Sequence, residues 1–276
     1  MYRYFRNELL LPIYIRKKTP KFYDFLNSVK VLKGSNVAII VAFEQPWALD
    51  WLLKMAKKNL KKTSILVFDN SRKLSFRKKI EFVAKKNKVF YYSLPEYNTH
   101  HVNRSHGMAL SWIYTNVIKV LQPKIFGFID HDLIPVSPID FTKAINSQPF
   151  YGRVTGNKSG FWSLWAGYCL FDFNYLTDKK INFLYDFTKG LDTGGRNWKS
   201  LYSNFQKNQL VFASSTIKTI YLPKFKNGME VYFIDNKWIH IGSISYNNTF
   251  DKKFNFFKAL AHELELDQKW KRLLKK

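Results

Sequence analysis

Two aspartates separated by one residue, Asp130 and Asp132, are the side chains of this sequence best suited to chemistry. They follow the apolar run Ile125–Ile129, which predicts a buried strand. Ligands of α/β proteins bind beyond the carboxyl ends of strands. Two carboxylates placed there, with no adjacent Lys or Arg, repel each other unless a cation lies between them. Mg²⁺ and Mn²⁺ prefer oxygen ligands and bridge carboxylates to substrate phosphates, so the pair predicts a metal–diphosphate site.

The segments before this pair alternate between continuous apolar runs and helical patterns. Continuous apolar runs are typical of strands covered on both faces, and their alternation with helices predicts right-handed parallel βαβ units. We expect strands at 37–43, 64–68 and 89–92 and helices at 46–60, 74–86 and 103–121, the last capped by Asn103.

The sequence pattern changes after Pro135. Aromatic strands at 150–154 and 161–173 flank a Gly-containing turn, which predicts a hairpin. Helices near 178–189 and 197–209, strands at 217–222 and 231–241, and a terminal amphipathic helix at 251–276 are expected to follow. The predicted organisation is an N-terminal extension at 1–33, a main domain at 34–245 divided into halves at 34–135 and 136–245, and the C-terminal helix at 246–276.

The composition favours a folded protein that attracts polyanions. Among 276 residues, 45 are Lys or Arg and 20 are Asp or Glu, a net charge of +25. This excess favours nucleotides, nucleic acid or an anionic membrane as partners, although a solvated basic surface explains it equally well. A nucleic-acid-binding protein is the alternative function, but the basic residues are dispersed and show no zinc spacing or reader motif. The single cysteine, Cys169, is expected to be a buried structural thiol in a reducing compartment.

This order of features resembles glycosyltransferases of the GT-A fold, closest to family 2-like enzymes. The resemblance covers about residues 36–245 and rests on the Asp-x-Asp motif at the end of an apolar strand. It implies a mixed, largely parallel sheet flanked by helices, and a Mn²⁺- or Mg²⁺-dependent, inverting transfer of a sugar. The donor would be a nucleotide-sugar, UDP-sugar before GDP-sugar, and the acceptor a glycan, lipid-linked or protein molecule, as in polysaccharide biosynthesis. A non-catalytic nucleotide-binding protein of this fold is a further alternative.

The resemblance assigns the donor nucleoside to the ends of the first two strands. The positions that match are Ala42, Phe43 and Glu44 after the first strand, and Asp69 and Asn70 after the second. A carboxylate at a strand end can accept a hydrogen bond from a base or ribose, and Phe43 could lie against the base. The alternative is that Asp69 and Asn70 simply form a turn.

The run from Asn103 to Ala109 resembles the basic segment that precedes the Asp-x-Asp strand in this family. Arg104 and His106, beside a helix N-terminus, would neutralise phosphate charge of the donor. Asn103 is as well explained as an ordinary helix cap.

The resemblance also assigns the metal ligands. Asp132 would be the first ligand, and Asp130 would contact ribose or bind the metal through water. His131 would point to the opposite side if the strand geometry continued. His240, followed by Gly242 at the end of a late apolar strand, would complete the coordination, although a histidine in such a place is more often structural.

The acceptor side of the resemblance is less specific. Asp192 would be the base that takes the proton of the acceptor hydroxyl, although the Glu-Asp pair frequent at that site is missing and a turn residue is equally credible. Trp162, Trp165 and Tyr168 could form a sugar-stacking wall, or belong to the core as aromatic strand residues usually do.

The C-terminal helix carries Lys269, Lys271, Arg272, Lys275 and Lys276. A basic amphipathic helix can lie on an anionic membrane, which would suit a lipid-linked acceptor, or it can pack on the main domain with its charges outward. No apolar stretch is long enough to cross a bilayer. The expected location is therefore the cytoplasm, or peripherally the inner face of a membrane.

Overall fold

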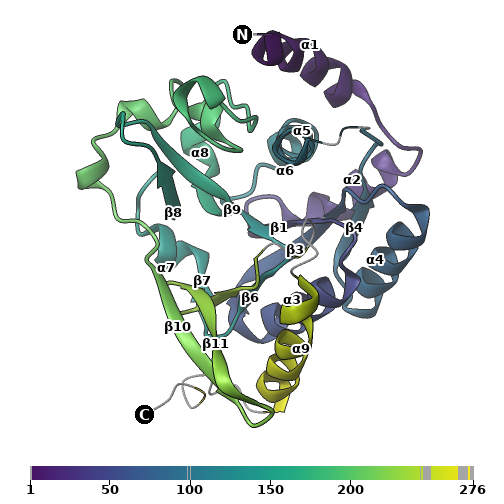
Figure 1. Ribbon diagram of the computed structural model, residues 1–276. Coiled ribbons are helices and arrows are strands. Elements are labelled where there is room, and N and C mark those ends of the chain that lie inside the picture. The colour runs from purple at the N-terminus through teal and green to yellow at the C-terminus, as the bar shows by residue number, and fades with distance from the viewer. Residues whose placement is uncertain are drawn as a thin grey trace.

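A six-stranded sheet forms the centre of the described part of the chain, residues 2–97, 99, 101–242, 244, 250–266 and 273 of this computed structural model (Figure 1). Its order is β4 (Phe90–Ser93), β3 (Thr63–Asp69), β1 (Asn36–Ala42), β5 (Ile125–Asp130), β9 (Trp162–Asp172) and β8 (Phe150–Gly156). The first four strands are parallel, whereas β9 and β8 run antiparallel to their neighbours. The predicted fold class and the predicted 150–173 hairpin are confirmed.

The central strand β1 explains why this sheet has two hydrophobic cores. Its side chains alternate, so that Ala38 and Ile40 enter one core while Val37 and Ile39 enter the other. All seven residues of the strand are buried. A continuous apolar run is therefore required here, as expected for a strand with helices on both faces.

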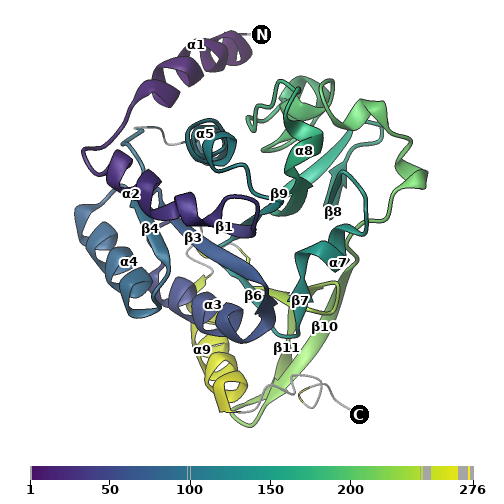
Figure 2. The ribbon, with the colours of Figure 1, turned by 180° about the vertical axis from the view of Figure 1, so that it is seen from behind.

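Helices cover both faces of the sheet (Figures 1 and 2). One core takes side chains from α3 (Pro46–Asn59), α4 (Leu74–Lys86) and α9 (Phe250–Leu266). The other takes them from α1 (Tyr2–Arg16), α2 (Phe22–Val29) and α5 (Val102–Ile113). The shorter helices are α6 (Lys119–Leu121), α7 (Phe141–Ile145) and α8 (Phe173–Leu176). The first 33 residues thus contribute to the core, while the predicted domain boundaries stay predictions.

The strand order reverses at β1. The chain passes from β1 to β3 and β4 on one side, and then returns to place β5 on the other side of β1. Such a reversal opens a crevice outside the carboxyl ends of the strands, where α/β proteins bind their ligands. Val41 lies opposite Asp130 in the parallel register, and Ala42 lies opposite Asp69. The predicted acid pair is therefore at the switch point.

A second, antiparallel sheet has the order β10 (Ser215–Leu222), β11 (Phe225–Ile234), β12 (Trp238–His240) and β6 (Leu133–Pro135), and β2 (Leu60–Lys61) pairs with β7 (Ile139–Asp140). The single strand predicted at 231–241 was wrong, because Asp235 and Asn236 adopt φ angles of 54° and 51° and turn the chain. Both residue types tolerate the left-handed region. After this turn, β12 pairs with β6 and places His240 opposite Leu133, the residue that follows Asp132.

The helices predicted near 178–189 and 197–209 were wrong. Within these ranges the chain forms short 3-10 turns, at Phe187–Lys189, Tyr202–Asn204 and Lys207–Gln209. Asn side chains take the place of helical carbonyls: Asn197 Oδ1 accepts the Asn182 N–H at 2.8 Å, and Asn182 Oδ1 accepts the Leu184 N–H at 2.9 Å. Side chain–backbone bonds of this kind compete with a helix.

The predicted cap of the helix before β5 was also wrong. The helix begins at Val102, and His101 is its cap, with Nδ1 accepting the Arg104 N–H at 3.3 Å. It continues from α5 through a π-helical segment at Tyr114–Ile118 into α6, which ends at Leu121 as expected.

Two further expectations concern the environment of the chain. Cys169 is buried, and burial raises the pKa of its thiol far above the ordinary value, which fits a structural residue. The described helices include none that is both long enough and apolar enough to span a bilayer.

The close packing of α5 on the chain at 183–184 yields a stability prediction. A Cβ added at Gly107 would lie 2.7 Å from the Phe183 carbonyl oxygen and 3.0 Å from the Leu184 Cα, which are backbone atoms that cannot rotate away. We expect Gly107→Ala to lower the free energy of unfolding by about 1–3 kcal/mol, although alanine is the better helix former. Urea unfolding measures this. The exposed α4 variant Lys78→Ala should change it by less than about 0.5 kcal/mol, and equal stability of the two variants would contradict the packing argument.

Candidate functional site

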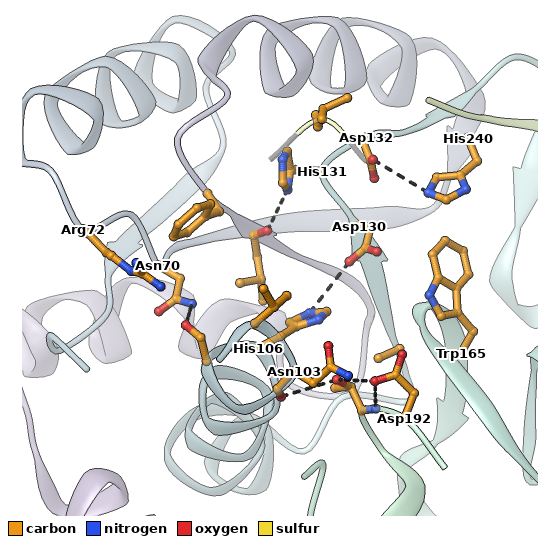
Figure 3. A pocket seen from close by; sticks show the side chains of 17 residues that line it. Asn70, Arg72, Asn103, His106, Asp130, His131, Asp132, Trp165, Asp192 and His240 are labelled. Atoms are coloured by element: carbon orange, nitrogen blue, oxygen red, sulfur yellow. Dashed lines mark hydrogen bonds and ion pairs between the residues drawn. The ribbon is translucent and has the colours of Figure 1, made fainter. Parts of the chain in front are cut away.

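A cavity of about 220 Å³ lies at the switch point, outside the ends of β1, β3 and β5 (Figure 3). Figure 3 shows Asn70 and Arg72 at one end, Trp165, His240 and Asp192 at the other, and Asp130 and Asp132 between them. Its lining comes from separate segments of the chain: Val41, Phe43, Asn70, Arg72, Val102, Asn103, Ser105, His106, Asp130, His131, Asp132, Trp165, Ala166, Asp192, Thr193, His240 and Ile244.

Asp130 reaches the cavity because it ends β5. Phe126 and Phe128 enter the core beneath α5, and the alternation of the strand puts Asp130 on that same side. Its Oδ1 lies 3.8 Å from Nε2 of His106, which α5 contributes. A Cβ on Gly167 would overlap the Asp130 carboxylate, so β9 leaves room for this acid only because residue 167 is a glycine.

Asp132 is held by the segment that follows β12. Its carbonyl oxygen accepts the Ile241 N–H at 3.0 Å, and its Oδ2 accepts the Gly242 N–H at 3.2 Å. Gly242 has a φ of +70°, which favours glycine. Nε2 of His240 lies 3.7 Å from the same Oδ2. The prediction that the His240–Gly242 segment meets the acid pair is therefore correct in position.

The electrostatics of the cavity are set by burial and by like charge. Burial raises the pKa of Asp130, and together with the negative charges of Asp132 and Asp192, partly offset by the nearby His131 and His240, it brings this pKa to about 7. Burial lowers the pKa of His106 to about 4, so its imidazole is neutral at pH 7. The 3.8 Å approach of His106 to Asp130 is thus a polar contact without an ion pair, and it leaves the repulsion between the acids uncompensated.

His131 does not point away from the cavity as expected. β5 ends at Asp130, so the alternation of side chains stops there, and His131 lines the cavity between the two acids. Its Nδ1 lies 3.2 Å from the Val41 carbonyl oxygen, close enough to donate a hydrogen bond to it. This contact fixes the ring against β1.

At the opposite end of the cavity, the loops after β1 and β3 are joined together. The Asn70 N–H donates to the Ala42 carbonyl at 2.9 Å, and the Asn70 amide donates to Ser105 Oγ at 3.0 Å. The Arg72 guanidinium lies 5.7 Å from the centroid of the Phe43 ring and donates to the Thr99 carbonyl. Arg72 was not predicted from the sequence, although it directly follows the run Asp69–Ser71.

Three of the predicted donor-binding residues lie outside the cavity lining. Asp69 is fully buried, and its carboxylate accepts the Ser71 N–H at 2.8 Å and the Tyr91 hydroxyl at 3.0 Å. Ala42 is fully buried as well. Glu44 Oε1 accepts the Arg72 N–H at 3.2 Å. These contacts correct the prediction: Asp69 shapes its loop, as the turn alternative proposed for it, Glu44 binds the loop that follows β3, and Asn70 and Phe43 face the cavity.

Arg104 is a further correction. Its side chain is buried and donates from Nη1 to Thr99 Oγ1 at 3.2 Å, and it does not line the cavity. On the first turns of α5, Asn103, Ser105 and His106 face the cavity instead. Sequence reasoning selected a segment that does line the cavity, but it could not tell which side of the helix turns inward.

Of the three aromatic residues predicted to form an acceptor wall, only Trp165 lines the cavity. Its ring centroid lies 4.8 Å from that of His240. Trp162 packs against Tyr202 in one core, and Tyr168 packs against Trp238 in the other, both almost fully buried. The alternative reading as core residues is correct for these two.

Asp192 lies beside Trp165 at the same end of the cavity (Figure 3). Its Oδ1 accepts the Thr193 N–H at 2.7 Å, which orients the carboxylate. The Thr193 hydroxyl donates to the Asn103 carbonyl at 3.4 Å and ties this loop to α5. Thr193 is a cavity residue that sequence analysis missed, although it adjoins the predicted base.

The cavity is not a complete metal cage. Within the described ranges, no three His, Cys, Asp or Glu side chains approach closely enough to hold a metal ion between them. What the cavity offers is two carboxylates, one at the end of β5 and one in the turn that directly follows, each with an imidazole 3.7–3.8 Å away.

Comparisons with solved structures return distant likenesses. The chain is similar to S. aureus TarS (15% identity, TM-score 0.37), to the bifunctional glycosyltransferase WbbM (11%, 0.35) and to the galactosyltransferase LgtC crystallised with donor and acceptor sugar analogues (10%, 0.36). The matches cover 54%, 54% and 52% of this chain, and 30%, 33% and 60% of those chains. No protein-family model matches the sequence, and no curated protein matches it.

The raised pKa of Asp130 yields a prediction for metal-free protein. Because the folded state binds this proton more tightly than the unfolded chain, ionisation of Asp130 lowers the free energy of unfolding as the pH rises from 3.8 to about 7. We therefore expect Asp130→Asn to be more stable than the wild type by about 1–3 kcal/mol at pH 8, and the gain to vanish near pH 4. Urea unfolding in EDTA measures it, with the exposed Asp178→Asn as control. A gain that does not change with pH would contradict the assignment.

Proposed function

We propose that this protein is a metal-dependent glycosyltransferase that moves a sugar from a nucleotide-sugar to an acceptor. The observation that supports this proposal is the convergence of Asp130, Asp132 and Asp192 on one cavity at the switch point, with polar groups at one end and an aromatic wall at the other. Three carboxylates in one cavity require a cation, and a separate acid at the far end suits a proton transfer.

Asp130 and Asp132 would hold Mn²⁺ or Mg²⁺, with His240 beside Asp132 as a further donor. The fit rests on the donor set, two carboxylates that line one cavity with imidazole nitrogens 3.7–3.8 Å away, and on the burial and like charge that raise the pKa of Asp130. Carboxylate and imidazole are suitable ligands for Mn²⁺, and Mg²⁺ commonly takes one or two carboxylates together with substrate phosphates. When bound, the cation would neutralise the charge of the departing nucleoside diphosphate.

The donor nucleoside would lie toward Asn70, Phe43 and Arg72. Phe43 and the Arg72 guanidinium offer a surface for a base, and Asn70 and Ser105 offer hydrogen-bonding groups near the diphosphate. A UDP-sugar is the first candidate and a GDP-sugar the second. His106, neutral at pH 7, can exchange hydrogen bonds with a sugar or phosphate oxygen without adding charge.

The acceptor would enter from the side of Trp165 and Asp192. A sugar ring can pack on the indole face. Asp192, oriented by the Thr193 N–H, would accept the proton of the acceptor hydroxyl as that oxygen attacks the anomeric carbon. Attack from this end, opposite the diphosphate, would invert the anomeric centre. The acceptor would be a glycan, a lipid-linked sugar or a protein.

The proposed membrane contact falls largely outside the described residues. The basic positions 269, 271, 272, 275 and 276 are not described. The described part of α9 packs inward through Phe256, Phe257, Leu260 and Leu264, which are buried. Peripheral binding at the inner face of a membrane stays a proposal.

Calorimetry tests the donor site. We expect UDP or GDP to bind in the presence of Mn²⁺, and EDTA to weaken binding by about tenfold or more, because the acid pair then repels the diphosphate. Asp132→Asn should weaken Mn²⁺-dependent binding to a similar degree, whereas Asp178→Asn should leave it unchanged. Salt-sensitive binding of RNA or DNA without any metal-dependent nucleotide binding would instead support the nucleic-acid alternative.

Turnover separates an enzyme from a non-catalytic relative. We expect a nucleotide-sugar to be hydrolysed slowly without acceptor and faster with one. Asp192→Asn should reduce transfer by about 100-fold or more and leave the affinity for the nucleotide within about twofold. Asp186→Asn, which removes a buried acid that binds Lys189 outside the cavity, is the matched control. An Asp192→Asn variant with full transfer activity would remove this residue from its role.

A further inference from the structure

The ladder between β8 and β9 is interrupted next to the cavity. Gly152 pairs with Cys169, but the next pair along β8 is Val154 with Leu164. Residues 165–168 of β9 therefore lie opposite Arg153 alone. Bulges bend a strand, re-aim its side chains and are frequent beside active sites.

This bulge places Trp165 in the cavity. The residues on either side of the bulge, Leu164 and Cys169, belong to one core, whereas Trp165 packs partly buried against the other core and lines the cavity beside His240. A Cβ on Gly167 would overlap both the Trp165 ring and the Asp130 carboxylate. The indole is therefore held by its neighbours on the acceptor side of the acid pair.

Arg153 lies against this indole. Its guanidinium carbon is 5.3 Å from the centroid of the Trp165 ring, within the range of a cation–π contact. The side chain is half-buried, and it forms no ion pair with any Asp or Glu that the structure describes. Arg77 and Arg196, by contrast, are engaged, Arg77 with the Leu94 carbonyl and Arg196 with Glu8.

An arginine that is stacked on an indole and forms no ion pair with a described acid can bind an oxyanion. Its planar fork matches a carboxylate or a phosphate with two parallel hydrogen bonds, while stacking on Trp165 fixes the orientation of the fork. Asp130, Asp132 and Asp192 would repel an anionic acceptor from the same cavity. Arg153 does not itself line the cavity, but its guanidinium lies against Trp165, which does, so its positive charge offsets this repulsion at that end.

We propose that Arg153, stacked on Trp165 at the β8–β9 bulge, makes the protein select an acceptor sugar that carries a carboxylate or a phosphate. This inference rests on the proposed function, which leaves the acceptor open. Arg153 binds the acidic group of the acceptor, Trp165 packs on its ring, and Asp192 faces the hydroxyl that attacks. Selection for an acidic acceptor separates this site from one that takes neutral sugars.

Matched acceptors test the proposal. The donor is first chosen by hydrolysis of a nucleotide-sugar panel without acceptor. Release of the nucleoside diphosphate is then followed with 4-nitrophenyl glycosides of glucose, galactose and mannose, each in its neutral, uronic-acid and 6-phosphate form. We expect kcat/KM to be at least about tenfold higher for the charged member in at least one series, as one charge-assisted contact provides. The uronic acids and the phosphates distinguish the two sources of the oxyanion.

Variants of Arg153 separate recognition from support of the fold. Arg153→Gln should reduce kcat/KM for the charged acceptor about tenfold or more, mainly through KM, and reduce that for the neutral acceptor far less. Arg153→Lys should retain part of the preference because it keeps the charge. Lys207→Gln removes an exposed positive charge that does not line the cavity and should change nothing.

Three results would overturn the proposal: neutral acceptors preferred in every series, no acceleration by any charged acceptor, or an equal loss for charged and neutral acceptors in Arg153→Gln. The last would mean that Arg153 only positions Trp165. Failure of the wild type to bind a nucleotide or to hydrolyse any donor is a different result, because it rejects the proposed function itself.

Discussion

The repulsion between the carboxylates of Asp130 and Asp132 is the constraint on which the site depends. Both acids lie in one half-buried cavity, and burial together with the neighbouring charge raises the pKa of Asp130 to about 7. An unassisted pair of this kind costs stability, which a protein tolerates when a ligand offsets it. The backbone N–H of Gly242 stabilises the Asp132 carboxylate, but the Asp130 carboxylate has no comparable donor in the described structure. A bound cation would remove the repulsion, which is why we connect the pair with a diphosphate donor.

The two sheets meet to build this cavity. The central sheet delivers the ends of β1, β3 and β5 to one edge, because parallel strands share their direction. The antiparallel sheet then brings His240 to the acids through the pairing of β12 with β6. At the bulge in β9, Trp165 packs partly buried against the core and closes one end of the cavity. The walls of the cavity thus come from the strand ends of the central sheet, the pairing of β12 with β6 and the bulge in β9. Each of these lies where a strand ends or becomes irregular.

Polarity divides the cavity into two ends with distinct tasks. The end at Asn70 and Arg72 offers hydrogen-bond donors and a cation, as a phosphorylated nucleoside requires. The end at Trp165 offers an aromatic face with Arg153 behind it and Asp192 beside it. The acid pair lies between them, so that a bond broken there would have a leaving group on one side and an attacking hydroxyl on the other.

Local pattern was sufficient to predict from the sequence the parallel strands, the helices at 46–59 and 74–86 and the acid pair at the end of β5. Continuous apolar runs, and a polar residue directly after a strand, indicate these features within a few neighbouring residues of the chain. Tertiary structure decided which side chains face the cavity. Arg104 turns inward while His106 faces the cavity, and the Asp69 carboxylate is bound by Ser71 and Tyr91. Of the three aromatic residues, Trp165 alone lines the cavity. The physical reason is that the face of a side chain depends on strand register, a bulge or a helix rotation, and these are set by partners distant in sequence. The helix predicted near 178–189 was replaced partly for the same reason, since the Asn197 amide oxygen binds the Asn182 N–H across 15 positions, and partly by the local bond from the Leu184 N–H to Asn182.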